Sequence, residues 1–460
     1  MKETASDFIA KSTIRAADRE HRRKIRFNIG RYDAAVPNGK SQFVQLDTAR
    51  ERAKNLRWRS LEHLDRQLEQ FEAMITRRGA RVIWAEDAQQ ALDAIRRICE
   101  ETNCKTLVKS KSMVTEEIHL NDFLEQQGIE SVETDLGEYI QQLDGEPPYH
   151  IVTPAMHKSK EDVAKLFAEK LGTDPKATPQ ELTLTARRIL REKYVQAEVG
   201  VTGANFLVAD VGGIAITENE GNARLSCAMP RTHIVIAGIE KVIPSLTDLA
   251  LFWPLLATYG TGQKVTVYNT LVTGPRQPGE TDGPEDMYVI LLDNGRTRIL
   301  ADPRQRESLC CIRCGACLNA CPVYKNIGGH TYAATYSGPI GAVITPHLRE
   351  LGDWKHLSEA SSLCGNCTEV CAVKINLHEL LLENRHEAVV SGHSPLAERM
   401  AWKLWKQAML RRSWMNLANG RSKSWVVNQL LPGWSKHRGA LLFPDRSFNQ
   451  RWREKKRNAR

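Results

Sequence analysis

The spacing of four cysteines constrains this chain more than any other feature of its sequence. The run starts at Cys311, ends at Cys321 and is followed at once by Pro322, with the spacing C-x2-C-x2-C-x3-C-P. In bacterial ferredoxins this spacing supplies three thiolates to one iron–sulfur cube and sends the fourth to a second cluster. A structural zinc ion is satisfied by two C-x2-C pairs, so the run favours iron–sulfur chemistry over zinc.

A second cysteine run follows the first and contains Cys364, Cys367 and Cys371. In the two-cluster plan, each run gives ligands to its own cluster and its last cysteine to the other. Applied to this chain, the plan assigns the first cluster to Cys311, Cys314, Cys317 and Cys371, and the second cluster to Cys321, Cys364 and Cys367.

This assignment leaves the second cluster one thiolate short. Where a complete run would have its first cysteine, three residues before Cys364, the chain has Ser361. Two alternatives remain open: a 4Fe–4S cluster with a non-cysteine or exchangeable fourth ligand, or a 3Fe–4S cluster. We interpret Cys310, next to the first run, as an incidental buried thiol, with a spare ligand as the alternative.

Composition places the protein in a reducing compartment. The chain has 460 residues and eleven cysteines, and most of the cysteines lie in the two groups, which is a metal-binding pattern and not a disulfide framework. The N-terminus has no apolar signal segment, and no stretch is apolar for long enough to span a bilayer. We expect a cytoplasmic protein, with peripheral association with the inner face of the membrane as an alternative.

The C-terminal end differs in charge from the rest of the chain. The net charge of the chain is +9, and residues 401–460 hold fifteen Lys and Arg against only Asp445 and Glu454. We expect this end to dock on a partner subunit, with an anionic membrane surface as the second choice and nucleic acid as the least favoured. Six of the ten tryptophans lie in it: Trp402, Trp405, Trp414, Trp425, Trp434 and Trp452.

The pattern along the chain predicts four segments. They are a charged, loosely packed helical arm (1–69), an α/β domain (70–300), an α-helical two-cluster ferredoxin domain (301–390) and a basic, tryptophan-rich helical region (391–460). Within the α/β domain, alternating strands and helices favour a largely parallel sheet. We expect strands at 81–84, 107–109, 129–134, 206–209, 213–217, 233–237, 264–268 and 287–292, helices at 88–102, 114–127 and 178–197, and a hairpin at Asn294-Gly295 leading into 297–300.

The α/β domain shows polar clusters but no motif that names a reaction. Gly212, Gly213, Asn222 and Arg224 are the candidates for an anion pocket, because glycine backbone and a guanidinium suit carboxylate or phosphate. A solvated turn is the alternative, and it is favoured on chemistry alone. The segment Lys109–Ser112 lies at a strand-to-helix junction that attracts anions, with an exposed charged loop as the alternative. His150, His233 and His330 are expected to be structural, and catalytic residues stay unassigned.

Six segments together resemble the iron–sulfur proteins of L-lactate utilisation. The resemblance runs over nearly the whole chain, and it implies a lactate-utilisation domain of the sugar-phosphate isomerase and CoA-transferase type. It also implies the same cluster ligands as the spacing. One departure is Ala372, where the family usually has proline after the last cysteine, which puts the first cluster's potential in doubt. The segments are Val108–Met113, Glu133–Glu138, Gly221–Arg224, Cys314–Pro322, Ile327–His330 and Tyr336–Gly341.

The resemblance implies a function that the spacing alone does not. The family is expected to pass electrons through two 4Fe–4S clusters during oxidation of L-lactate to pyruvate, together with companion lactate-utilisation subunits and an electron acceptor at the membrane surface. Two alternatives stay open. One is an enzyme subunit that binds a small organic acid in the α/β domain and uses its clusters structurally. The other is an iron–sulfur protein that binds nucleic acid through its basic end.

Overall fold

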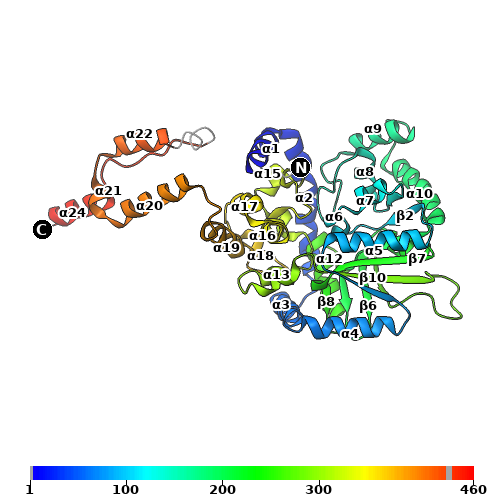
Figure 1. Cartoon of the computed structure of the whole chain (residues 1–460). Helices are drawn as coiled ribbons and strands as arrows, with labels where there is room; N and C mark the ends of the chain where they lie inside the picture. The colour runs from blue at the N-terminus through cyan, green and yellow to red at the C-terminus, as the bar shows by residue number, and fades with distance from the viewer. Residues whose placement is uncertain (1–3, 431–437, 460) are drawn as a thin grey trace. The chain divides into compact units, whose positions relative to one another are not determined.

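The computed structural model describes residues 4–430 and 438–459, and it divides into two compact units, Met1–Glu387 and Ala388–Arg460. The division falls close to the boundary that the sequence predicts at residue 390. The arm, the α/β domain and the ferredoxin segment therefore fold together as one unit, which runs from blue to yellow-brown in Figure 1.

Four helices precede the first strand. They are α1 (Ala5–Ala17), α2 (Arg19–Lys40), α3 (Leu46–Glu62) and α4 (Leu64–Thr76). This segment is helical, as its sequence predicts, but it is not loosely packed. Ile25 and Ile29 lie one turn apart on α2 and are buried, and α2 packs against α12 and α15. A narrow apolar face in a highly charged helix is sufficient to fix it on the core.

A parallel six-stranded sheet forms the centre of the α/β domain, in the order β1-β10-β7-β4-β2-β3. The predicted parallel α/β layer is thus confirmed. Adjacent residues of β7 face opposite sides, because Ile234 and Ile236 belong to one core cluster while Val235 and Ala237 belong to another. The strands are β1 (Arg81–Ala85), β2 (Thr106–Lys109), β3 (Glu130–Glu133), β4 (Val199–Thr202), β7 (Thr232–Gly238) and β10 (Asp286–Leu292).

Helices connect these strands. The predicted capping box opens α10, where Thr178 and Glu181 bond each other's backbone. The single helix expected over 114–127 is instead two, because His119 takes a left-handed conformation with φ 55°. The helices are α5 (Ala88–Glu101), α6 (Met113–Glu117), α7 (Leu120–Gln126), α8 (Leu136–Asp144), α9 (Lys160–Leu171), α10 (Pro179–Gln196) and α11 (Asn222–Ala228).

A smaller four-stranded sheet packs against one face of the main sheet together with α4. Its strand β9 covers Tyr268–Val272, so the strand predicted at 264–268 lies about four residues too early in the chain. The predicted hairpin after Asn294 is wrong: Gly295, with φ 90°, is the N-cap of a helix, and the carboxylate of Asp293 accepts the backbone N–H of Thr297. The elements are β5 (Phe206–Val208), β6 (Gly213–Glu218), η1 (Ile239–Lys241), β8 (Val242–Ile243), η2 (Leu246–Asp248), α12 (Leu249–Thr261), β9 (Tyr268–Val272) and α13 (Arg296–Ala301).

The cysteine segment is built from short helices, as the sequence predicts. Its apolar side chains share one core with α2, α3 and α12, so the α/β domain and the cysteine loops are packed together without a linker. The elements are η3 (Arg306–Cys310), α14 (Ala316–Ala320), α15 (Tyr324–Ile327), η4 (His330–Tyr332), α16 (Gly338–Leu348), α17 (Leu351–Glu359), α18 (Asn366–Glu369) and α19 (Leu377–Val390).

The basic C-terminal region is also helical. Its tryptophans at 402, 405, 414, 425 and 452 are exposed, while Trp434 lies outside the described residues. Within the described part of the chain, no helix combines the length and the apolar character needed to cross a bilayer. The helices are α20 (Leu396–Leu410), α21 (Arg412–Asn416), α22 (Gly420–Leu430) and α24 (Phe448–Asn458).

Candidate metal centres and the adjoining cavity

The first cysteine group surrounds a small, mostly apolar space. Cys311 and Cys314 lie on the turn that leads into α14, Cys317 lies in α14 and Cys371 follows α18. All four line this space. Gly315 makes the turn possible, because it holds φ at 79° as the N-cap of α14. The C-x2-C-x2-C spacing thus folds into one tight coil, and a distant cysteine closes it.

Burial makes these thiols hard to ionise without a compensating charge. It raises the pKa of Cys371 to about 12, and the nearby Cys311 sulfur contributes. Burial also raises the pKa of Cys314 and Cys317, again with neighbouring cysteines adding to the effect. Two backbone N–H groups donate to sulfurs of the group, from Arg313 to Cys311 Sγ at 3.4 Å and from Ile375 to Cys371 Sγ at 3.3 Å. Ligation by a metal centre would supply the missing positive charge.

The cysteines assigned to the second cluster, Cys321, Cys364 and Cys367, form a second cysteine group that is closer to solvent. Cys321 caps α14 and Cys367 lies in α18, and these two helices pack against each other. Burial raises the pKa of Cys367 to about 11, with the sulfurs of Cys321 and Cys364 as further causes. Cys364 itself is exposed. At the position of the missing ligand, the hydroxyl of Ser361 accepts the backbone N–H of Leu363 at 3.1 Å. The structure therefore brings together the two groups that the spacing predicts, and the second group stays incomplete.

Arg57 connects helix α3 to the start of the cysteine run and to the segment that contains η1 and β8. It lies on α3 with 1% of its surface exposed, and its guanidinium donates to the carbonyl of Cys310 at 3.3 Å and that of Leu309 at 3.1 Å. It also donates to the carbonyl of Val242 at 2.8 Å and to that of Glu240. One side chain thus holds the start of the cysteine run against β8. The Cys310 thiol is buried, and burial raises its pKa to about 12.

A cavity of about 340 Å³ adjoins the first cysteine group. The segments that follow β2 and β4 contribute 110–114 and 203–205 to its wall, and the end of β6 contributes 216–220. The end of α12 and the cysteine loop complete it, through Gly260 and Cys314. Cys314 lines both this cavity and the space inside the first cysteine group, so the two are neighbours.

The anion pocket expected from Gly212, Gly213, Asn222 and Arg224 does not form. Of these four residues, Asn222 lines the cavity. Gly212 instead packs on α4, where a Cβ would lie 2.4 Å from the backbone N of Ile75, and Gly213 faces Leu271. Arg224 is exposed and lies over the ring of Tyr268 at 5.3 Å. The two glycines are needed for close packing, and the guanidinium is on the surface.

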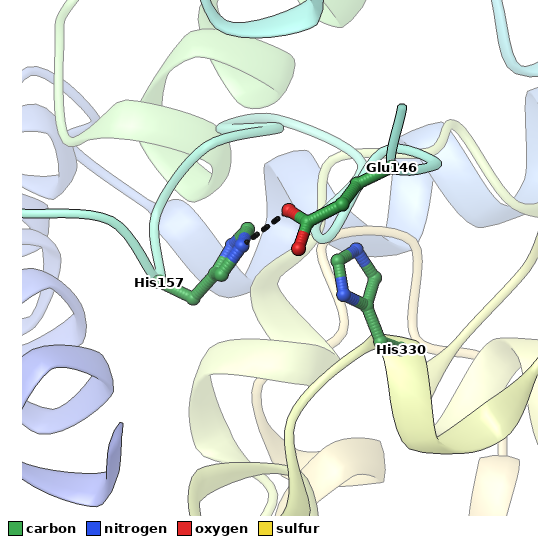
Figure 2. Close-up of side chains that lie close together, drawn as sticks. All are labelled: Glu146, His157 and His330. Carbon is green, nitrogen blue, oxygen red and sulfur yellow. Dashed lines mark hydrogen bonds and ion pairs between the residues drawn. The ribbon is translucent and has the colours of Figure 1, made fainter. Parts of the chain in front are cut away.

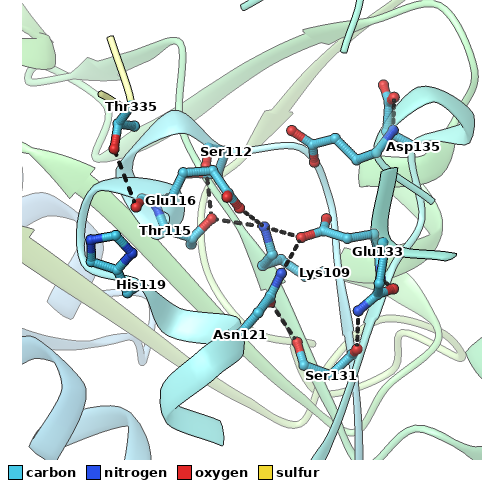
Figure 3. A network of polar contacts seen from close by, with 12 residues as sticks. Lys109, Ser112, Thr115, Glu116, His119, Asn121, Ser131, Glu133, Asp135 and Thr335 are labelled. Carbon is cyan, nitrogen blue, oxygen red and sulfur yellow. Dashed lines mark hydrogen bonds and ion pairs between the residues drawn. The ribbon is translucent and has the colours of Figure 1, made fainter. Parts of the chain in front are cut away.

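The two lysines of the strand-to-helix junction Lys109–Ser112 have different surroundings, and Figure 3 shows Lys109 between Glu116 and Glu133. Lys109 is fully buried, with Nζ 2.6 Å from Glu133 Oε1 and 3.0 Å from Glu116 Oε1. Two positions later, Lys111 lines the cavity and donates from Nζ to the carbonyl of Val152 at 2.7 Å. The sequence did not distinguish these lysines, because burial of a charged side chain depends on carboxylates that lie elsewhere in the chain.

A histidine–glutamate cluster lies where the loop after α8 meets η4 (Figure 2). The ligand atoms of Glu146, His157 and His330 lie within 4.8 Å of one another. His157 Nε2 and Glu146 Oε2 form a hydrogen bond of 3.0 Å, and Lys158 Nζ lies 2.9 Å from the same oxygen. His330 Nε2 donates to the carbonyl of Pro147 at 2.7 Å. Because a lysine already neutralises the carboxylate, we interpret this cluster as a structural contact.

Comparison with known proteins identifies the α/β domain and the cysteine segment separately. The family model described as "LUD domain" matches residues 68–292, and the model described as "4Fe-4S dicluster domain" matches residues 307–375. "Lactate utilization protein B" of Bacillus velezensis is 48% identical over 77% of this chain and 75% of that protein. The protein of the same name from Bacillus licheniformis is 44% identical over 87% of this chain and 83% of that protein. The chain belongs to the lactate utilization protein B family.

Further comparisons extend this result without changing it. "Lactate utilization protein B" of Bacillus subtilis (strain 168) is 46% identical over 78% of this chain and 77% of that protein. A solved DUF162 family protein from Deinococcus radiodurans matches with 13% identity and a TM-score of 0.28, over 50% of this chain and 98% of that chain. That likeness is too weak to carry an argument.

The cysteine groups of this lactate utilization protein B family member fit clusters better than single ions. In the described residues, no three cysteine sulfurs lie within 4.8 Å of one another. A tetrahedral zinc ion with Zn–S bonds of about 2.3 Å holds its sulfurs only about 3.8 Å apart. An iron–sulfur cube holds thiolates at its corners, farther apart. The match to the dicluster domain supports iron–sulfur clusters, and the described sulfurs do not form a ready zinc site.

Proposed function

We propose that this protein is the iron–sulfur electron-transfer subunit of a system that oxidises L-lactate to pyruvate. The observation that carries the proposal is the pair of cysteine groups on two packed helices, α14 and α18, in a chain whose curated relatives are named for lactate utilisation. When bound, the clusters would supply single-electron acceptance and release. The chain's own residues hold, shield and connect them.

The two groups assign ligands to two clusters. A 4Fe–4S cluster takes Cys311, Cys314, Cys317 and Cys371, which share one lined space. The second cluster takes Cys321, Cys364 and Cys367, and either an exchangeable ligand completes a 4Fe–4S cluster or the site holds 3Fe–4S. The exposure of Cys364 supports an exchangeable ligand, because solvent reaches this corner of the site.

The different surroundings of the two groups suggest a direction for electron flow. The first group is buried and borders the cavity, so it is placed to receive electrons from a donor. The second group is nearer to solvent, so it is placed to pass them on. The interleaved ligands keep the two sites adjacent, since Cys317 and Cys321 lie on one short helix and its cap.

The partners follow from the same proposal. Companion lactate-utilisation subunits would bring the substrate electrons. The exposed tryptophans and basic residues of α20, α22 and α24 offer a surface for a partner or for an acceptor at an anionic membrane. Nucleic acid remains the least favoured partner. Catalytic residues are not part of the proposal.

Cluster reduction by lactate tests the function. Protein purified without oxygen is mixed with L-lactate, with and without the companion subunits, and cluster reduction is followed by absorbance and EPR. Reduction only in the presence of the companions is the expected result. Reduction by this chain alone would place lactate oxidation in this chain, and no reduction under either condition would contradict the proposal. D-lactate and a Cys314→Ser variant are the controls.

A further inference from the structure

The cavity next to the first cysteine group lies where α/β proteins bind ligands. Segments 110–114 and 203–205 follow the carboxyl ends of β2 and β4, which are adjacent in the parallel sheet. Ligands of open α/β sheets bind beyond this edge. The volume of about 340 Å³ is also within the range of small-molecule sites. The position and size therefore mark a binding site that the cysteine motifs do not explain.

Two cations that line this cavity, Lys241 and Arg313, have donor groups to spare. Lys241 has 7% of its surface exposed, and no residue in the described ranges forms a hydrogen bond or salt bridge with its ammonium group. The guanidinium of Arg313 lies over the ring of Tyr336 at 4.5 Å, and its Nη2 lies 3.8 Å from Glu240 Oε1. Its Nη1 is buried without a hydrogen-bond partner among the described residues. Lys111 adds a third positive charge from the sheet edge. A buried donor without an acceptor, such as Arg313 Nη1, is rare in folded proteins and indicates a missing ligand.

The acidic residues of the same cavity are already occupied. The carboxylate of Glu218 accepts the backbone N–H of Ala223 at 2.7 Å, and that of Glu220 accepts the backbone N–H of Leu136 at 3.0 Å. Asp135 caps α8 by accepting the N–H of Glu138 at 3.1 Å. These three carboxylates already accept hydrogen bonds from backbone N–H groups, whereas Lys241 and Arg313 have donors without acceptors in the described part of the chain. The cavity is thus suited to an anion despite its equal numbers of acidic and basic side chains.

We propose that this cavity binds a small organic carboxylate beside the first cluster, with Lys111, Lys241 and Arg313 facing the carboxylate group. Asn222 and the hydroxyl groups of Ser110 and Thr217 line the same space and suit the hydroxyl or keto oxygen of a 2-hydroxy or 2-oxo acid. This assignment rests on the proposed function, which supplies such acids. Inorganic phosphate would also bind to these cations, and the experiment below distinguishes phosphate from an organic carboxylate.

The cluster itself provides the other explanation for these cations. Arg313 and Lys241 lie near Cys311, and the negative charge of a ligated cluster attracts them without any further ligand. Lys111 decides in favour of a ligand site, because it reaches the cavity from the sheet and pairs with a single backbone carbonyl. A bound carboxylate then adds negative charge next to Cys314. It lowers the reduction potential of the first cluster, and reduced protein binds the acid more weakly than oxidised protein.

Equilibrium binding to the intact, cluster-loaded protein tests the proposal. Pyruvate, L-lactate and inorganic phosphate are titrated by calorimetry into oxidised protein and into dithionite-reduced protein. We expect at least one of the two acids to bind, to bind more weakly after reduction, and to change the EPR signal of one cluster. Lys111→Met and Lys241→Met should each weaken binding about tenfold to a hundredfold, because each removes a charged hydrogen-bond donor.

The controls keep the two proposals separate. Lys165→Met removes one exposed lysine from α9 and should leave binding unchanged, and the iron content shows that each variant retains its clusters. If neither acid binds, or if phosphate alone binds, the cavity proposal is overturned even where the clusters titrate normally. If the acid binds but the clusters are redox-silent, the proposed function fails and the ligand site stands. If Lys165→Met weakens binding as much as Lys111→Met does, the cavity proposal is also overturned.

Discussion

Replacement of Arg57 should loosen the start of the cysteine run. The Arg57→Met variant keeps most of the apolar stem but leaves four buried carbonyl oxygens without their donor, at Leu309, Cys310, Glu240 and Val242. Each lost bond to a charged donor removes roughly 1–3 kcal/mol, and these losses are not additive. Relief from burying the guanidinium offsets part of the loss, because burial lowers the pKa of Arg57. We expect unfolding to become easier by about 3–5 kcal/mol.

The assay is anaerobic urea unfolding, followed by far-UV circular dichroism and by the visible absorbance of the clusters. A loss of this size lowers the urea midpoint by roughly 1 M for a chain of this size. Arg59→Met is the matched control, because Arg59 is exposed on the same helix. Arg57→Lys keeps the positive charge but loses the planar set of N–H donors, so we expect its urea midpoint to lie between those of the wild type and Arg57→Met. If Arg57→Met and Arg59→Met unfold at the same urea concentration, the bridging role of Arg57 is refuted.

Four further predictions concern other parts of the molecule. Ser361→Cys should supply the missing thiolate and raise the iron content or the oxygen resistance of the second cluster. Cys310→Ala should leave the iron content unchanged. Iron and sulfide analysis with EPR checks both, and an unchanged second cluster in Ser361→Cys or a loss of iron in Cys310→Ala would contradict the corresponding prediction. Burial lowers the pKa of His233 from 6.5 to about 4, so its contribution to stability is complete above pH 6.5 and is lost as the pH falls towards 4. Wild-type protein should therefore lose about 1 kcal/mol through this residue between pH 7 and 5.5, and His233→Gln should show a smaller change in urea midpoint; an equal change would contradict the assignment. Deletion of residues 391–460 should leave both clusters in place, because the compact unit ends at Glu387, and a loss of iron would contradict this.

The sequence predicted the features that depend on local spacing. The cysteine groups, the capping box at Thr178 and the buried strands all follow from patterns within a few residues, and the structure contains each of them. The predicted hairpin after Asn294 is absent because Asn-Gly also suits the start of a helix, and here the Asp293 carboxylate accepts the backbone N–H of Thr297 in the first turn of that helix. Nothing in the local pattern separates these two outcomes.

The cavity could not be predicted, because its residues come from distant segments. Lys111, Lys241 and Arg313 are brought together by the packing of the cysteine loop on the sheet edge. Arg57 is similar, since its carbonyl partners lie more than 180 positions away in the chain. The glycine pair at 212 and 213 was a misleading signal, because glycine permits close backbone packing as well as anion binding.

An EPR-monitored redox titration tests the central claim most directly, with iron and sulfide counted on the same anaerobically purified protein. The account predicts two clusters that titrate reversibly, and a signal in the oxidised state would identify the second as 3Fe–4S. Iron that is absent, or present but redox-silent, would contradict the electron-transfer role and make the cysteine groups structural.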